Sequence, residues 1–395
     1  MDKPRIRFKG YIDAWEQRKF SDFTWASGKR NKEDLDLETY AITKEHGFIS
    51  QNKAHDEFGY MKDTDRKAYN IVTPNSFAYN PARINIGSIG YYEGTENVIV
   101  SSLYEVFQTS DYVDDRFLWH WFKSDEFPKW IECLQEGSVR LYFYYDKLCE
   151  CQILMPSVAE QKKIATSLDH LDHLITLHQR KCDETKKLKK YMLQKMFPQK
   201  GANVPEIRFD GFTDAWEQCK FGDLGSVSMC KRIFKEQTSI IGDIPFYKIG
   251  TFGGKPDAFI TRELFEEYKE KFPYPQIGDM LISASGTIGR IVEYTGENAY
   301  FQDSNIVWFK HDDKIDNLFL KCVYAVVKWS GIEGSTIRRL YNDNFLKTEF
   351  CMPQIEEQKE IGTYFSILDH IITLHQRKCE NLQYIKKFML QNMFV

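Results

Sequence analysis

The amino-acid sequence predicts a mixed α/β fold in which two globular domains are separated by two long antiparallel coiled-coil helices, as a tandem repeat with pseudo-twofold symmetry. Two internal repeats lead to this prediction. A long helical stretch occurs twice, because Leu171–Cys182 and Leu368–Cys379 agree at eleven of twelve positions without a gap. A shorter motif also occurs twice, with Pro4–Phe23 matching Pro205–Leu224 at thirteen of twenty positions. The chain therefore consists of two half-proteins offset by about 200 residues.

Each copy of the long stretch begins just after a proline, which suits the first position of a helix. Its apolar residues recur at alternating spacings of four and three, which is the pattern of a coiled-coil seam. Lys386 interrupts this pattern in the second copy, and Thr185 and Lys189 weaken it in the first. Because neither helix can bury its apolar stripe alone, we expect the two helices to pack against each other. The residues expected on this seam are Leu168, Leu171 and Ile175 in the first helix and Phe365, Leu368 and Ile372 in the second.

The repeats divide the chain into six segments. A variable body lies between each short motif and the long helix that follows, and its short aromatic and β-branched runs predict strands separated by turns. The stretch 198–205 contains Pro, Gly and Asn, as expected at a domain boundary. The predicted segments are the N-terminal motif at 1–19, the first body at 20–155, the central helix at 156–200, the linker and repeated motif at 201–220, the second body at 221–352 and the C-terminal helix at 353–395.

Length and composition are those of an ordinary globular protein with more than one domain. The chain has 395 residues, of which 42% are hydrophobic and 28% charged, and a single core rarely grows beyond about 250–300 residues. Nine cysteines without a C-x-x-C pair fit reduced thiols better than disulfides or a zinc site. The first residues lack the apolar run of a signal peptide, and no apolar stretch is long enough to cross a bilayer. We therefore expect a cytoplasmic protein that makes no membrane contact.

The two bodies differ in sequence but share landmarks in the same order. Gly87-Ser88-Ile89-Gly90 corresponds to Gly286-Thr287-Ile288-Gly289, and Tyr144 corresponds to Tyr341. Glycine allows the backbone to approach a ligand closely, and arginine binds phosphate or reads guanine through a bidentate pair. One scaffold with two different surfaces suits a protein that reads two different targets. The candidate DNA-binding residues are Asn85, Ser88, Arg140, Ser283, Ser285, Thr287, Arg290, Arg338 and Arg339.

Each of these candidates also has a purely structural interpretation, in which the glycines make tight strand connections and the hydroxyls cap turns. We favour DNA binding for the loops as a group because they occur in both bodies. No metal site is expected. His170, His173 and His178 lie on the first helix, but only His170 and His173 share a face, and no carboxylate–cysteine set completes four ligands.

The order of body, helix, body and helix, with AEQKKI and EEQKEI opening the helices and DAWEQ in the short repeat, resembles the specificity subunit of a type I restriction–modification system. The resemblance covers essentially the whole chain. It implies that each body is a target-recognition domain that reads one half of a split double-stranded DNA sequence, without catalysis. It also implies that the helices dock two modification (adenine methyltransferase) subunits and that restriction (motor–nuclease) subunits complete the complex. S-adenosylmethionine, ATP and Mg2+ would then belong to these partners, and this chain would hold no cofactor.

Two other classes of function remain open. The first is an enzyme, either a methyltransferase using Asn80-Pro81 or a metal-dependent nuclease using Asp257, Glu267 and Lys269. Against these, the methyltransferase motif lacks its second proline and its aromatic residue, and Glu267 lies in a stretch of helix-forming composition where a nuclease needs a strand. The sequence also contains no G-x-x-x-x-G-K-[ST] phosphate loop. The second class is a coiled-coil adaptor that binds only proteins.

Overall fold

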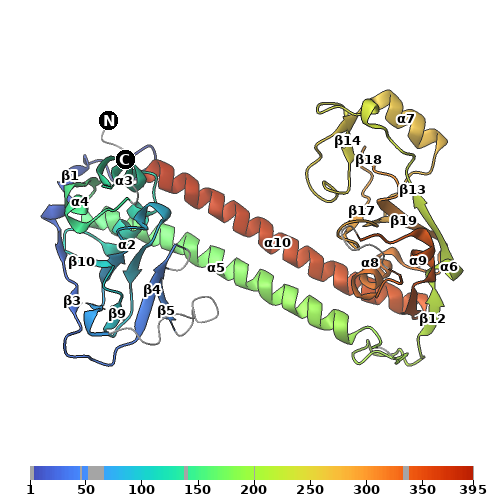
Figure 1. Cartoon of the computed structure of the whole chain (residues 1–395), viewed down its shortest axis with the longest axis horizontal. Helices are drawn as coiled ribbons and strands as arrows, with labels where there is room; N and C mark the ends of the chain where they lie inside the picture. Colours follow the sequence, from blue (N-terminus) through green and yellow to red (C-terminus); the bar gives the residue numbers. More distant parts are fainter. Residues whose placement is uncertain are drawn as a thin grey trace. The chain divides into compact units, whose positions relative to one another are not determined.

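The computed structural model describes residues 4–44, 47–51, 66–137, 141–199, 201–331 and 338–394. Its contacts divide the chain into two compact units, one formed by Met1–Gln179 with Arg377–Val395 and the other by Arg180–Gln376. The long helices predicted from the repeats are α5 (Val158–Lys195) and α10 (Ile355–Met393). Each long helix contributes one half to each unit, so the units cut across the six predicted segments (Figure 1). No helix in the described part of the chain is both long and apolar enough to cross a membrane.

The body of the first unit is a mixed α/β domain. Its strands are β1 Glu16–Lys19, β2 Thr24–Ala26, β3 Lys29–Arg30, β4 Thr39–Thr43, β5 Gly47–Ser50, β6 Asn70–Val72, β7 Ser76–Tyr79, β8 Ile89–Tyr92, β9 Val98–Val100, β10 Glu105–Thr109 and β11 Gln152–Met155, and its α-helices are α2 Asp115–Phe122, α3 Glu126–Leu134 and α4 Tyr145–Glu150. A four-stranded sheet has the order β2-β10-β7-β8, and a five-stranded sheet has the order β3-β6-β9-β4-β5. Strand β1 pairs antiparallel with β11, so the N-terminal motif lies beside the strand that leads into α5.

The body of the second unit repeats part of this plan. Its strands are β12 Glu217–Lys220, β13 Gly225–Met229, β14 Ile244–Tyr247, β15 Phe259–Ile260, β16 Met280–Ser283, β17 Ile291–Glu293, β18 Tyr300–Phe301, β19 Ile306–His311 and β20 Glu349–Met352, and its α-helices are α6 Phe221–Leu224, α7 Arg262–Lys271, α8 Asn317–Val326 and α9 Asn342–Lys347. The sheet β13-β19-β16-β17 and the pair β12-β20 correspond to β2-β10-β7-β8 and β1-β11 of the first unit. The small sheet β15-β14-β18 replaces the five-stranded sheet, and this is where the two bodies differ most.

The two long helices run antiparallel, as the sequence predicts. In the first unit, Leu168 near the start of α5 belongs to the same buried core as Met393 near the end of α10. In the second unit, Phe365 and Leu368 near the start of α10 pack in one core with Met196, which follows the end of α5. The ends of both helices are therefore part of the domain cores, and burial of such apolar side chains contributes about 1.5–3 kcal/mol each.

The middle of the seam is less completely buried than its ends. Leu171, Ile175 and Ile372 are partly exposed. Two buried cysteines mark the contact line, because the Cys379 thiol lies 3.6 Å from the carbonyl oxygen of Ile175 and the Cys182 thiol lies 4.0 Å from that of Ile372. These contacts bring the backbone of Ile175 and of Ile372 next to the facing helix.

The lysines that interrupt the predicted seam are paired with aspartates of the facing helix. In the first unit, Lys386 Nζ lies 2.6 Å from Asp172 Oδ2, and in the second unit Lys189 pairs with Asp369. The two pairs are equivalent in the repeat, since Asp172 corresponds to Asp369 and Lys189 to Lys386. The interruptions are therefore ion pairs between the helices and do not weaken the pairing as the apolar pattern alone suggests.

A buried ion pair fixes the start of each long helix. The Nε and Nη2 groups of Arg7, in the N-terminal motif, donate to the two carboxylate oxygens of Glu160 at 2.7 Å each. Glu160 has 0% of its surface exposed, and the bidentate geometry is the strongest that arginine offers a carboxylate. Arg208 and Glu357 repeat the arrangement at the start of α10, again at 2.7 Å for both bonds.

The glutamine that follows each buried glutamate binds the N-cap residue of a helix in the body of the same unit. Gln161 Oε1 accepts the amide of Asp114, the N-cap residue of α2, at 2.9 Å. Gln358 Oε1 accepts the amide of Asp316, the N-cap residue of α8, at 3.0 Å. The Glu-Gln pair shared by the two helix openings thus connects the short motif, the long helix and the body in each unit.

Removing Arg208 should leave the Glu357 carboxylate buried without a partner. We expect Arg208→Ala to destabilise the second unit by about 3–5 kcal/mol, and we expect Arg208→Met combined with Glu357→Leu to restore most of the loss. Urea unfolding followed by tryptophan fluorescence measures both. The matched control is Arg232→Ala, because the Arg232–Asp303 pair is solvent-exposed on the arginine side and should cost at most about 1 kcal/mol. Equal losses for Arg208→Ala and Arg232→Ala would contradict this anchoring role.

Candidate nucleic-acid interface

Two segments far apart in the sequence meet in the second unit. Residues 338–341, which lead into α9, lie beside the loop that joins β16 to β17. The amide of Gly286 donates to the carbonyl of Arg338 at 3.0 Å, and the amide of Leu340 donates to that of Ala284 at 2.9 Å. Leu340 is buried, so these bonds fix the segment against the body while its other side chains face outward.

The first unit contains the same arrangement. Residues 141–144 lead into α4, and the amide of Phe143 donates to the carbonyl of Pro81 at 3.1 Å, in the loop that joins β7 to β8. Tyr144 occupies the N-cap position of α4, as Tyr341 does for α9, and about half of each tyrosine is exposed. We call these two segments, one in each unit, the pre-helix segments.

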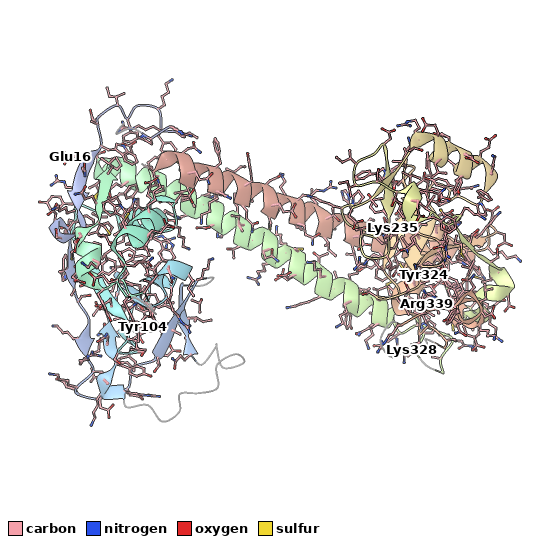
Figure 2. All side chains as sticks on the ribbon, turned by 45° about the horizontal axis from the view of Figure 1, so that its top comes forward. Glu16, Tyr104, Lys235, Tyr324, Lys328 and Arg339 are labelled. Carbon is pink, nitrogen blue, oxygen red and sulfur yellow. The ribbon has the colours of Figure 1, made fainter. Side chains whose placement is uncertain are left out.

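The structure brings three of the predicted DNA-binding residues together at the surface of the second unit. Thr287, Arg338 and Arg339 are all exposed, and the backbone of Arg339 pairs with that of Ser285 in the loop. Figure 2 labels Arg339 in the second unit. Arg290 is also exposed and stands where the loop enters β17, but its Nη1 donates to the carbonyl of Phe252 at 2.7 Å. This bond fixes the Arg290 side chain on the surface of the body.

Three predicted DNA-binding hydroxyls are instead inside the protein. Ser88, Ser283 and Ser285 are only 5%, 1% and 5% exposed. The hydroxyl of Ser283 donates to the carbonyl of Thr287 at 2.6 Å, and that of Ser285 donates to Asn305 Oδ1 at 2.8 Å. The Ser88 hydroxyl donates to a backbone carbonyl of β4 at 3.2 Å. These three hydroxyls form hydrogen bonds within the protein that stabilise the loops. They therefore have a structural role and are excluded from the proposed contacts to DNA.

The remaining two candidates lie in the first unit. Asn85 is exposed on a single 3-10 turn, Ile84–Ile86, within the loop that joins β7 to β8. Arg140 lies outside the described residues. The structure thus leaves Asn85 as the surface counterpart of the second unit's loop residues.

The shared glycine motifs occupy the same loop in the two units but not the same register. In the first unit Gly90 is already inside β8, opposite Ala78 of β7. In the second unit Gly289 precedes β17 and has a φ of +89°, a conformation that favours glycine. The predicted residue-by-residue match of Gly87–Gly90 with Gly286–Gly289 is therefore wrong by a few positions. The two sequence motifs alone could not reveal this difference in register, because both motifs lie next to a strand.

Two surface residues of the first unit were missed by the sequence analysis. Arg83 is exposed at the start of the 3-10 turn, and Tyr142 stacks on Tyr144 with ring centroids 5.5 Å apart and an interplanar angle of 2°. Arg83 lies four residues before Gly87, the first shared glycine of the loop. This position next to the shared motif could have identified it from the sequence. Tyr142 carries no comparable signal, because aromatic residues are abundant throughout this body.

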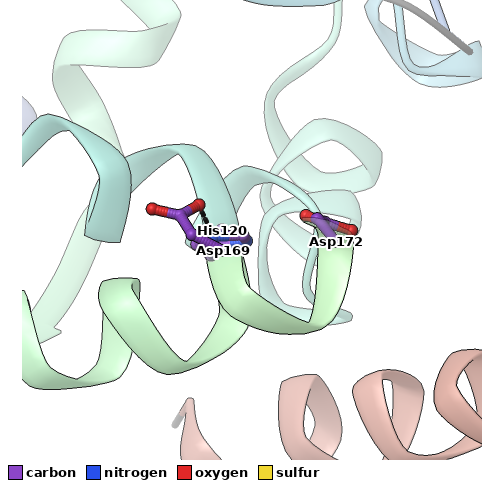
Figure 3. A group of neighbouring side chains, drawn as sticks. All are labelled: His120, Asp169 and Asp172. Carbon is purple, nitrogen blue, oxygen red and sulfur yellow. Dashed lines mark hydrogen bonds and ion pairs between the residues drawn. The ribbon is translucent and has the colours of Figure 1, made fainter. Parts of the chain in front are cut away.

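A cluster of charged groups connects α2 to α5 in the first unit. Among the described residues, the ligand atoms of His120, Asp169 and Asp172 lie within 4.8 Å of one another (Figure 3). His120 Nε2 lies 2.8 Å from Asp169 Oδ1, and Arg116 Nε lies 3.1 Å from the same oxygen. Asp172 pairs with Lys386. Because both carboxylates already face a cation, this cluster is better described as an ion-pair network than as a metal site.

The environment of this network shifts two pKa values. Burial of the ring lowers the pKa of His120 below its ordinary value, against the effect of the neighbouring Asp169. Burial works against ionisation of Asp169, but the hydrogen bonds from His120 and Arg116 outweigh it and lower the pKa of this carboxyl to about 2. At neutral pH the network therefore contains a neutral imidazole and an ionised carboxylate.

The residues suggested for catalysis do not form an active site. Asp257 pairs with Lys248 at 2.8 Å, whereas Glu267 lies on α7 and pairs with Lys271 at 3.1 Å. A metal-dependent nuclease needs these carboxylates on adjacent strands, so this alternative is wrong. The Asn80 side chain accepts the amide two residues later at 3.0 Å and so closes a turn, which is a structural role.

Two divergent bodies that present equivalent loops, each attached to the same antiparallel helix pair, define a recognition scaffold. Residues 13–187 and 213–384 match the family described as "Type I restriction modification DNA specificity domain". The chain belongs to this family. It is accordingly a non-catalytic specificity subunit with two target-recognition domains, as the resemblance of its repeats predicts.

Known relatives agree with this assignment. A putative type I restriction enzyme specificity subunit from Haemophilus influenzae is 42% identical over 274 residues, which cover 68% of this chain and 67% of that protein. The putative MjaX specificity subunit from Methanocaldococcus jannaschii is 22% identical in an alignment that covers 95% of this chain and 91% of that protein. The crystal structure of an S subunit from M. genitalium has the same fold, with a TM-score of 0.62 at 15% identity over 100% of this chain and 99% of that one.

The buried histidine makes the attachment of α2 sensitive to pH. An unfolded histidine binds a proton near pH 6.5, whereas the depressed pKa of His120 keeps the folded state from doing so. The free energy of unfolding is therefore highest above pH 6.5. It falls as the pH drops from 7 to 5, by at most about 1.4 kcal/mol per pH unit. Asp169 stays ionised over this range. The protection factors of the α2 amides, which correct for the slower intrinsic exchange at low pH, should therefore fall at pH 5 in the wild type and less so in His120→Gln. His170→Gln, on the exposed face of α5, is the matched control, and an equal fall in both variants would refute the role of His120.

Proposed function

We propose that this chain reads a bipartite site in double-stranded DNA, with residues 20–155 reading one half-site and residues 221–352 the other. It does so in the cytoplasm, in a complex with two modification subunits and with restriction subunits. The observation that supports the proposal is the repeated surface. Both bodies hold a strand-connecting loop against a pre-helix segment, although the residues that face outward differ. Equivalent placement with different chemistry is what two half-sites of different sequence require.

The proposed contacts to DNA are the exposed members of these surfaces. In the second domain they are Thr287, Arg290, Arg338 and Arg339, and in the first domain the described contact is Asn85. Cationic side chains supply the attraction to phosphate, whereas base edges supply the sequence. The net charge of −4 gives no general attraction to DNA, so the proposed attraction comes from local groups such as these.

The helix pair presents a second surface, which we assign to the modification subunits. On α5, Leu177, Leu188 and Tyr191 are between 36% and 49% exposed. Leu177 and Leu188 are separated by about three helical turns and so lie on one stripe. Leu188 directly precedes the seam residue Lys189 and so lies about 100° around the helix from the contact line. The stripe therefore flanks the seam without being covered by the partner helix, and exposed apolar surface of this kind marks protein interaction sites.

The same stripe occurs on α10. Leu374, Ile385 and Phe388 are between 44% and 47% exposed and stand at the positions equivalent to the three α5 residues. Two equivalent stripes on a tandem repeat offer two equivalent docking surfaces, which supports two copies of one partner. S-adenosylmethionine, ATP and Mg2+ are then bound by the partner subunits, because the proposed role of this chain is recognition and assembly.

The independence of the two recognition domains can be tested by exchange. Replacing residues 20–155 with the corresponding body of another family member should change one half-site of the methylated sequence and leave the other unchanged, because each body contacts only its own half-site. The measurement is long-read mapping of methylated adenines after expression with the modification subunits. The matched control exchanges residues 221–352 and should change the opposite half-site. A change in both half-sites after either exchange, or an uninterrupted methylation motif, would refute the bipartite proposal.

The docking surfaces can be tested one at a time. Leu188→Glu with Tyr191→Glu places charge on the α5 stripe, and Ile385→Glu with Phe388→Glu does the same on α10. Each double variant should lose one of two modification subunits, measured by native mass spectrometry of the complex. The conservative pair Leu188→Met with Tyr191→Phe keeps the surface apolar and should retain both. Retention of two subunits by both charged variants would show that the partners dock elsewhere.

A further inference from the structure

The pre-helix segments occupy the same place in the two domains but differ in chemistry. Phe143 and Leu340 are the buried residues of the two segments, and each donates its amide to the adjacent loop. The two residues before them are Leu141–Tyr142 in the first domain and Arg338–Arg339 in the second. The bond from the buried residue to the loop is shared, whereas the backbone of Tyr142 pairs with Glu136 and that of Arg339 with Ser285. The exposed side chains of the two segments also differ in chemistry.

In the second domain these side chains are two uncommitted guanidinium groups. Arg338 and Arg339 are exposed, and within the described part of the chain neither side chain makes a hydrogen bond or an ion pair. Other surface arginines of the same unit are engaged, since Arg290 binds the carbonyl of Phe252 and Arg232 binds Asp303. A guanidinium that is held by its backbone but free at its tip is suited to the bidentate contact with guanine O6 and N7.

In the first domain the equivalent positions are apolar and aromatic. Leu141 is 41% exposed, and Tyr142 lies flat against Tyr144, with ring centroids 5.5 Å apart. The stacked pair makes a rigid, uncharged surface, because each ring fixes the other. Such a surface cannot bind guanine as arginine does, but it can contact the C5-methyl group that thymine exposes in the major groove.

We propose that the two domains read different base chemistry: Arg338 and Arg339 read guanine in the major groove, and Leu141 and Tyr142 contact the methyl group of thymine. This inference rests on the proposed function and assigns a base type to each pre-helix segment. It requires at least one guanine in the half-site of the second domain and at least one thymine in that of the first.

Atom-level changes in the DNA test the two contacts separately. The complex of this chain with its modification subunits is used, and the methylation motif defines the two half-sites, which the body exchange assigns to their domains. Replacing guanines of the second half-site with 7-deazaguanine removes N7, and replacing thymines of the first with deoxyuridine removes the methyl group. We expect binding to weaken by about 5- to 150-fold at the critical guanine and by a smaller, measurable factor at the critical thymine.

Protein variants show which side chains are responsible. Arg338→Ala or Arg339→Ala should relax the motif at one guanine and abolish the effect of 7-deazaguanine there. The conservative Arg339→Lys keeps the charge but not the planar fork, so it should keep salt-dependent affinity while losing selectivity. Leu141→Ala with Tyr142→Ala should abolish the effect of deoxyuridine in the first half-site and leave the guanine effect in the second unchanged.

Two results would overturn the assignment while leaving the proposed function intact. One is a second half-site without a G·C pair, or a first half-site in which replacing every thymine with deoxyuridine leaves binding unchanged. The other is a uniform loss of affinity in Arg338→Ala and Arg339→Ala, with a smaller salt slope and an unchanged motif, which is the signature of phosphate contacts. The absence of any bipartite methylation motif in the presence of active partner subunits would instead refute the proposed function, and this inference with it.

Discussion

A buried carboxylate in the first turn of each long helix is the constraint on which each half of the protein depends. Glu160 and Glu357 are 0% and 1% exposed, and a charge so deeply buried must remain paired. Glu160 is paired with Arg7 of the N-terminal motif and Glu357 with Arg208 of the repeated motif, and the glutamine beside each glutamate binds the N-cap residue of α2 or α8. Motif, long helix and body are thereby fixed together at one point. The rest of each body can then differ in sequence without losing its attachment, which is what recognition of different targets demands.

Beyond this shared anchor, the two halves attach their bodies to the helices by different physical means. In the first unit, α2 is held to α5 by the network of Arg116, His120 and Asp169. In the second unit the position equivalent to Ala165 is Gly362, and a Cβ there would lie 2.7 Å from Leu318 Cβ. Close packing at that glycine is joined by an ion pair between Lys321 of α8 and Asp369 of α10, at 3.3 Å. Both attachments therefore contain charges, but only the first contains a buried histidine, which makes it the one that responds to pH near neutrality.

How much the sequence predicts follows from the range of the interactions involved. Helix periodicity is local, so both long helices are predicted correctly. The Arg7–Glu160 pair joins residues 153 positions apart and leaves no periodic trace, although identical Arg and Glu in both repeats are a signal that could have been used. The serine hydroxyls were misjudged for a related reason. A small polar residue beside glycine suits both a turn and a ligand, and only burial, as at Ser283, separates the two.

The charges within the seam favour antiparallel pairing of the helices, although the two copies agree at eleven of twelve central positions. Parallel pairing of equivalent positions would set Asp172 against Asp369 and Lys189 against Lys386, and like charges at a partly buried seam are costly. Antiparallel pairing instead sets each aspartate against a lysine. Polar residues on a coiled-coil seam are known to fix register and orientation at some cost in stability. The breaks in the apolar pattern thus favour the antiparallel orientation of the two helices, which is seen in each unit.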